Sequence, residues 1–166
     1  MSGLQLRYSV DDAVVQKLIK GLRDFDSHPV LGDIGQHMVN RVFDNFQDGK
    51  TFDGSDMAAS KRAKEQGGKT LVDSGLLRDS YTFSVSGDEV EIGSNDIRAA
   101  IHHFGGEIRA KNGGSLAFEI DGQVILVESV TMPARPVLGI TDQDEKDFSD
   151  LVVDHIRSIA NEHSAS

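Results

Sequence analysis

The chain has 166 residues, a formal net charge of -10 at pH 7 and no cysteine. Its length suits one domain over residues 1–166, and the missing cysteines exclude a disulfide framework and a thiolate metal site. The acidic balance argues against general binding to nucleic acid, whose phosphates attract basic surfaces. No signal peptide and no apolar run of the ~20 residues that a membrane helix needs are visible. We therefore expect a soluble intracellular protein.

Two amphipathic helices are expected in the first third of the chain. The first begins with Ser9 as its N-cap. Its apolar residues recur at helical spacing: Val14, Val15, Leu18, Ile19 and Leu22. Pro29 is tolerated in a first turn and opens the second helix, which ends at Asp48-Gly49. Its apolar stripe consists of Leu31, Ile34, Met38, Val42 and Phe46.

The segment at about residues 49–70 has no such periodicity. Its cations alternate with small residues, and they are Lys61, Arg62, Lys64 and Lys69. Segments of this length without regular structure are usually functional or disordered. We predict a long mobile loop and treat those four cations as interface candidates. A short helical turn capped by Asp73 or Ser74 is expected to follow.

Two β-hairpins are expected next. The first turns at Gly87-Asp88, a favourable two-residue turn, and pairs Val85 with Val90 and Phe83 with Ile92. Alternation along the strands then places these four apolar side chains on one face. The first hairpin therefore has one face suited to a core.

The second hairpin turns at Asp121-Gly122. This register gives the pairs Phe118–Ile125 and Leu116–Val127. The opposite face carries Val124 and Leu126 beside Ala117 and Glu119. Strands that are apolar on both faces need a second layer or a partner. Val124 and Leu126 are therefore interface candidates.

The remaining elements complete the expected fold. Residues 97–104 form a short helix, and Pro133 to Pro136 make a stiff connection out of the sheet. Thr141 and Asp144 form the capping box of a last helix. Its predicted buried face consists of Phe148, Leu151, Val152, Ile156 and Ile159. Residues 161–166 are a polar tail. This order indicates an α+β fold of N-terminal helices, antiparallel hairpins forming a small sheet and a C-terminal helix packed on it.

Two motifs offer an alternative function as a small nucleotide- or metal-dependent enzyme. Residues 63–70 match a relaxed phosphate-binding loop that would use Lys69 and Thr70, but no strand signal precedes them. His102 and His103 could be metal ligands, although neighbouring residues point to different sides of a helix. Serines are not placed in a nucleophile motif. We predict no catalytic, cofactor-binding or metal-binding residues.

Four segments in order resemble the phage virion morphogenesis family, the tail-completion or neck proteins of Mu-like and related tailed phages. These segments are residues 71–80, 90–95, 99–106 and 133–139. The likeness extends from about Asp33 to the last helix. The chain departs from the family at Phe52, where Trp is frequent, and at His103, where Gln is common.

The resemblance implies a phage or prophage virion assembly protein that is not an enzyme and needs no cofactor. Such a protein acts in tail completion or head–tail joining through contacts with tail-tube, neck or head proteins in the bacterial host cytoplasm. A homo-oligomer on the particle, such as a ring, is expected, whereas membrane and specific nucleic-acid partners are not. Arg135, between Pro133 and Pro136, offers a guanidinium fork for a carboxylate or for backbone carbonyls and completes the interface candidates. Permanent and transient roles both remain open.

Overall fold

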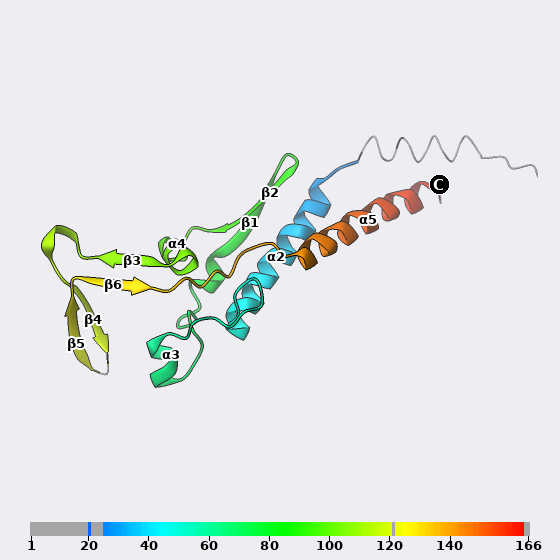
Figure 1. Cartoon of the computed structure of the whole chain (residues 1–166). Helices are drawn as coiled ribbons and strands as arrows, with labels where there is room; N and C mark the ends of the chain where they lie inside the picture. Colours follow the sequence, from blue (N-terminus) through cyan, green and yellow to red (C-terminus); the bar gives the residue numbers. More distant parts are fainter. Residues whose placement is uncertain (1–19, 21–24, 121, 165–166) are drawn as a thin grey trace, which may run out of the picture.

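The computed structural model describes residues 20, 25–120 and 122–164 (Figure 1). The first predicted helix therefore lies outside the described residues except for Lys20. The helices are α2 (His28–Asp48), α3 (Lys61–Gln66), α4 (Ile97–Phe104) and α5 (Asp142–Ser164). The strands are β1 (Tyr81–Ser86), β2 (Glu89–Ser94), β3 (Gly106–Arg109), β4 (Leu116–Ile120), β5 (Gln123–Val127) and β6 (Ser129–Met132). This mixture confirms the α+β class. No helix within the described ranges is long and apolar enough to cross a membrane.

Helix α2 forms where its apolar stripe predicted it and supplies the centre of the core. Pro29 lies in its first turn, and Gly49 ends it in the left-handed conformation with φ 66°. Val42 and Phe46 are 1% and 0% exposed. They belong to a cluster completed by Met57, Leu77, Ala99 and Val137. The core therefore gathers segments from most of the described chain.

The β1–β2 hairpin packs on α2 (Figure 1). Its register confirms the predicted pairs, with Val85 opposite Val90 and Phe83 opposite Ile92. The Phe83 ring lies directly over Gly35 of α2, where an added Cβ would overlap the ring. Glycine in this helix therefore permits a close approach that a larger residue would prevent.

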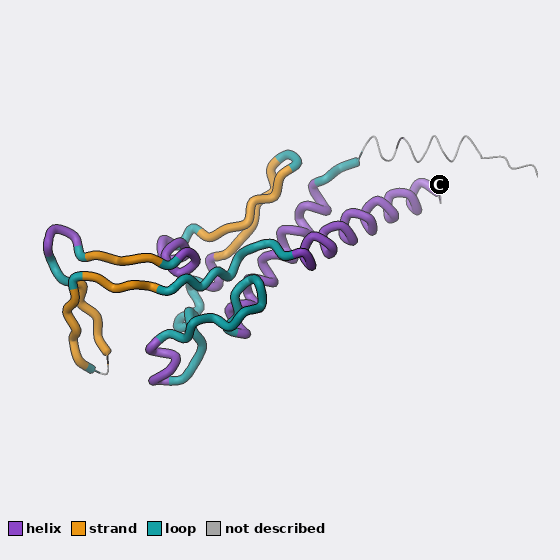
Figure 2. The backbone as a smooth tube through the Cα atoms, viewed as in Figure 1, coloured by secondary structure: helices purple, strands orange, loops and turns teal. Residues whose placement is uncertain are grey.

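The strands make three separate two-stranded sheets, so the expected single small sheet is wrong in this detail (Figure 2). The β4–β5 register confirms the predicted pairs, with Phe118 opposite Ile125 and Leu116 opposite Val127. The β3–β6 pairing was not predicted; it places Ile108 opposite Val130. Because no local turn joins these two strands, short-range sequence signals do not reveal their pairing.

Helix α5 packs along α2, rather than on a sheet as predicted (Figure 1). Its capping box is confirmed: Thr141 N donates to Asp144 Oδ2 at 2.7 Å, and Asp144 N donates to Thr141 Oγ1 at 3.3 Å. The predicted buried face is only half-buried at Phe148, Leu151, Val152 and Ile159 and is exposed at Ile156. Within the described chain α2 is the main cover for this face, which explains the incomplete burial.

The segment at residues 49–70 contains more regular structure than predicted. It contains α3, whose N-cap Ser60 Oγ accepts from Ala63 N at 3.1 Å. Met57 is 7% exposed and joins the core, while the ring of Phe52 lies over Gly139. The segment is therefore anchored to the body, and its mobility stays a prediction. The predicted helical turn is present, since Ser74 Oγ accepts from Leu76 N at 3.4 Å and Asp79 N donates to Gly75 O at 2.9 Å. It continues into a 3-10 turn at Arg78–Ser80.

Candidate interaction surfaces

The strands β3, β6, β4 and β5 form an arm, here defined as residues 106–132, that extends away from α2 and α5 (Figure 1). The β3–β6 pair leaves the body directly after α4, and the β4–β5 hairpin lies at its far end (Figure 2). Val124 and Leu126 of the hairpin are 71% and 64% exposed. Phe118 and Ile108 of the arm are also exposed. Apolar side chains thus reach solvent on both faces of the hairpin, as predicted for a partner-binding element.

The four cations of the 61–69 segment divide into two pairs. Arg62 Nη2 donates to the main-chain oxygens of Lys69 at 2.8 Å and Val72 at 3.1 Å, while Lys69 Nζ donates to Gln47 Oε1 at 2.8 Å. These two side chains hold the segment against the body. Lys61 and Lys64 of α3 are exposed. Of the four candidates, this pair presents its charges to solvent most directly.

Arg135 was expected at an interface, but the structure buries it to 4% exposure. Its Nε donates to Ala58 O at 2.6 Å, and its main-chain N donates to His102 O at 2.8 Å. Arg135 therefore connects three segments inside the body. This burial leaves it little surface for a partner, so we assign it a structural role.

Replacing Arg135 by Met should lower the free energy of unfolding by about 1–3 kcal/mol. The change keeps much of the volume of the buried side chain but removes the guanidinium that donates to the Ala58 carbonyl in a part-buried hydrogen bond. Arg109→Met is the matched control, because the Arg109 side chain is 75% exposed and should cost less than ~0.5 kcal/mol. Denaturant unfolding of both variants measures the difference. Equal losses would show that the Arg135–Ala58 hydrogen bond contributes little.

The predicted phosphate-loop alternative has the wrong geometry. In a phosphate-binding loop, the glycine-rich turn follows a strand and opens a helix, so its amides face the phosphate. Here Gly67 and Gly68 come after α3 instead of before it. Thr70 is buried, and its Oγ1 accepts from Ser60 N at 3.1 Å. The segment is therefore built as a packed connection.

His102 and His103 diverge, as their adjacent positions on a helix predict. His102 Nδ1 is buried and has no hydrogen-bond partner among the described residues. Burial, and then the charges of Arg135 and Arg98, lower the pKa of His102. The His103 ring packs edge-on against Phe104, with centroids 4.6 Å apart, and burial lowers its pKa as well. Both rings are half-buried, and the lowered pKa favours the neutral form of each.

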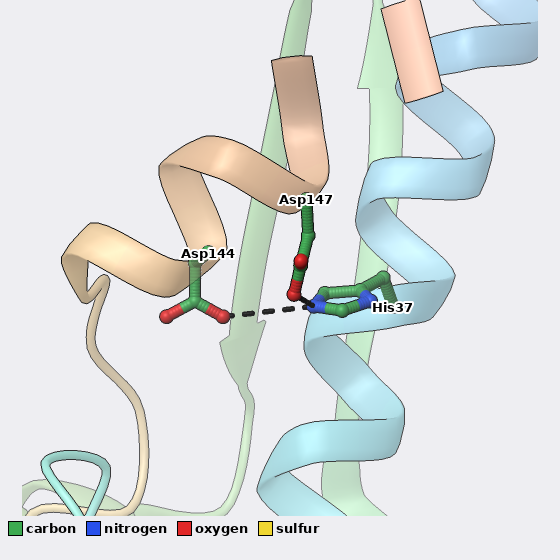
Figure 3. A group of neighbouring side chains, drawn as sticks. All are labelled: His37, Asp144 and Asp147. Atoms are coloured by element: carbon green, nitrogen blue, oxygen red, sulfur yellow. Dashed lines mark ion pairs between the residues drawn. The ribbon is translucent and has the colours of Figure 1, made fainter. Parts of the chain in front are cut away.

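A different histidine lies close enough to two carboxylates for the three groups to share a metal ion. His37 Nε2 is 3.6 Å from Asp144 Oδ1 and 3.6 Å from Asp147 Oδ2 (Figure 3). These residues join α2 to the first turns of α5. Arg41 Nη1 forms an ion pair with the same Oδ1 of Asp144. The guanidinium therefore already neutralises the oxygen that a metal ion would need. The arrangement is best described as a charged clamp between the two helices.

Asp144 is the centre of the clamp and is fully buried. Burial alone raises the pKa of Asp144, but hydrogen bonds from Arg41 and Thr141 outweigh it and lower that pKa to about 2. Arg41 also donates to Phe52 O at 3.0 Å, so the clamp reaches the 49–70 segment. The capping box predicted the bond between Thr141 and Asp144. The spatial meeting with His37 and Arg41 had no local sequence signal.

Helix α4 carries an exposed surface that the sequence interpretation missed. Ile97 is 92% exposed and Phe104 is 77% exposed. They are seven residues apart and therefore share one face of the helix with Ala100 and Ile101. Ala99, on the opposite side, is buried in the core. The helical spacing of Ile97, Ala100, Ile101 and Phe104 is a sequence signal that predicts this apolar face of α4.

Comparisons with known proteins identify the family of the chain. The model of the phage virion morphogenesis family matches residues 10–157. The chain is similar to the Mu-like prophage FluMu G protein 2 of Haemophilus influenzae, with 32% identity over 129 residues, which cover 78% of each chain. No solved structure matches the chain. The match over most of its length shows that this chain belongs to the phage virion morphogenesis family.

Proposed function

We propose that the protein completes the tail or joins tail to head during virion assembly, and that it acts through protein–protein contacts without catalysing a reaction. It works in the host cytoplasm while particles are being built. The arm is the observation that carries this proposal. Its hairpin exposes Val124 and Leu126 at a site where no other described element covers them. Family membership places the protein in virion morphogenesis.

The energetics of the arm explain why it serves a partner. A two-stranded hairpin is marginally stable in water by itself. Covering exposed Val and Leu side chains contributes about 25 cal/mol per Å² of apolar surface removed from water. The rest of the chain contributes little of this free energy to the β4–β5 hairpin, because Val124 and Leu126 remain 71% and 64% exposed. Docking on another phage protein supplies the missing cover.

The combined variant Val124→Asp and Leu126→Asp should fold normally but fail to support particle completion. Both side chains are exposed, but the new Asp at position 124 faces Glu119 across the strands, so we expect the free energy of unfolding to fall by about 1 kcal/mol. Two carboxylates in a desolvated apolar contact oppose docking strongly. Infectious titre after complementation of a phage lacking this gene measures the effect, and we expect a loss of at least tenfold.

Thr82→Asp and Ser84→Asp together form the matched control. These residues are exposed on β1, and their replacement adds the same charge to the other hairpin of the chain. We expect the control to restore the titre. If the arm variant restored it equally well, the arm would have no role in assembly.

The partner class is tested by capturing tagged protein from a lysate in which the phage is assembling. Mass spectrometry should recover tail-tube, neck or head proteins, and the arm variant should recover less of them. The same measurement on purified particles separates a permanent component from a transient factor. Recovery of no virion protein in the presence of abundant bait would contradict the proposed function.

A further inference from the structure

One carboxylate lies within the exposed apolar face of the arm. Glu119 of β4 is directly opposite Val124 of β5, and Ala117 is opposite Leu126. Side chains that face each other across two strands lie on the same side of the hairpin, with Cβ atoms about 5 Å apart. Val124 and Leu126 are 71% and 64% exposed, and Glu119 is exposed beside them. This face, here called the hairpin face, therefore combines uncovered apolar side chains with one negative charge.

The charge of Glu119 is not neutralised within the part of the chain that the structure describes. Its carboxylate takes part in no hydrogen bond or ion pair there. The arm has two cations, of which Arg109 is paired with Glu107 at 2.8 Å and Lys111 forms no ion pair with Glu119. Residues 115–134 contain three acids and no Lys or Arg. The hairpin face is therefore acidic as well as apolar.

This combination restricts what can cover the hairpin face. A partner that covers Val124 also takes Glu119 out of water, because the two residues are opposite each other. Burying an unpaired carboxylate strongly opposes docking. A cation of the partner in contact with the carboxylate offsets that cost and selects partners that carry it. An uncharged apolar surface is thus a poor match for this face.

We propose that the arm recognises a cationic apolar surface on another virion protein. Apolar side chains of that protein cover Val124 and Leu126, and a Lys or Arg among them pairs with Glu119. The formal net charge of -10 opposes the approach of a second copy of the chain and favours a basic partner. This inference deepens the proposed function and rests on it. Glu119 is then the residue of the arm that determines specificity.

Glu119→Gln distinguishes a cationic partner surface from an uncharged one, because Gln keeps the size of the side chain and removes its charge. If a cation faces Glu119, the change leaves that cation unpaired. The infectious titre and the capture of virion proteins by the tagged full-length chain should then fall several-fold. If the surface is uncharged, the same change removes an unfavourable burial, and capture should stay equal or rise. Glu119→Lys brings like charges together and should lower the titre at least tenfold.

Glu91→Gln and Glu91→Lys are the matched controls. Glu91 is an exposed residue of β2, opposite Ser84 in the other hairpin of the chain. We expect both controls to keep the wild-type titre and capture. Denaturant unfolding of the four variants separates a loss of docking from a loss of folding. Higher salt should weaken capture by the wild type more than capture by Glu119→Gln, since exposed charges are screened over about 10 Å at 0.1 M ionic strength.

Suppressors of Glu119→Lys locate the cation of the partner. They should replace a Lys or Arg of another virion protein by an acidic or neutral residue, and the same replacement should lower the titre when position 119 is Glu. Suppressors at this chain's own Lys or Arg residues would mean that a second copy covers the hairpin face, which overturns the proposal.

Wild-type titre and capture for both Glu119 variants also overturn the proposal, as does stronger capture by Glu119→Gln. In each of these cases the proposed function stands if the combined Val124→Asp and Leu126→Asp variant still fails to support particle completion. If that combined variant restores the titre, the role of the arm in assembly falls together with this inference.

Discussion

Replacing Asp144 by Asn is expected to lower the free energy of unfolding by about 3 kcal/mol, because it breaks a buried ion pair at one partner. Asp144 is 0% exposed and accepts the Thr141 main-chain N–H while pairing with Arg41. The variant leaves the Arg41 guanidinium without its counter-charge. Denaturant unfolding near pH 7 measures the loss.

Asp142→Asn is the matched control for this prediction. Asp142 is exposed in the same first turn of α5, so both changes remove one negative charge near the helix N-terminus. We expect the control to cost no more than ~0.5–1 kcal/mol through the helix dipole. Comparable losses in the two variants would mean that the dipole, and not the clamp, explains the effect.

The clamp should also affect how the free energy of unfolding changes as the pH is lowered. The pKa of Asp144 is about 2 in the folded protein, against an ordinary value of 3.8. A lowered folded pKa gives stability that is present above the unfolded value and is lost as the pH falls from about 4 toward 2. The loss should amount to about 2 kcal/mol. Asp96 titrates in the same range, but it does so in both proteins. The difference between wild type and Asp144→Asn should therefore shrink across this window, and a constant difference would contradict the clamp.

Gly105→Ala is expected to be similarly damaging, with a loss of at least about 3 kcal/mol. Gly105 has φ 69°, and an added Cβ would lie 2.7 Å from Ala134 N and 2.8 Å from Met132 O. With ψ −171°, this backbone lies in a region that is essentially restricted to glycine, which costs about 1–3 kcal/mol for an L-residue, and overpacking adds about 1–3 kcal/mol. Both neighbouring atoms belong to the main chain, so they cannot move aside as a flexible side chain would.

Gly67→Ala separates the two contributions. Gly67 has nearly the same backbone conformation, with φ 73° and ψ 176°, but nothing lies within 4 Å of its added Cβ. We expect this control to lose only the backbone cost of about 1–3 kcal/mol. Thermal or denaturant unfolding of both variants gives the difference that belongs to the close approach. Because Gly105 joins α4 to the arm, its variant should also reduce the infectious titre, even at temperatures where it remains folded.

Local patterns predicted the elements whose stabilising contacts are close in sequence. The hairpins at Gly87-Asp88 and Asp121-Gly122 form in the predicted register, since a two-residue turn determines which residues face each other. Helix α4 has the predicted bounds, and the Thr141–Asp144 capping box is present. In each case the interacting residues are separated by only a few positions along the chain.

Contacts between distant segments were not predictable in this way. The 49–70 segment lacks periodicity, but Met57 is buried beside Phe46 and Leu77, which are brought to it by the fold. Arg135 was expected at the surface and is instead bonded to Ala58, 77 residues away along the chain. A charged side chain becomes internal when a distant carbonyl satisfies it, and its own neighbours in sequence give no sign of that partner.

The sequence by itself determined the α+β class, the family resemblance, the register of two hairpins and the unpaired apolar residues Val124 and Leu126. Tertiary structure alone decided that β3 pairs with β6, that α5 lies along α2 and that His37, Arg41 and Asp144 meet. The reason is physical. Turns, caps and amphipathic faces depend on neighbouring residues, whereas strand pairing without a turn and buried charge depend on which distant segments pack together.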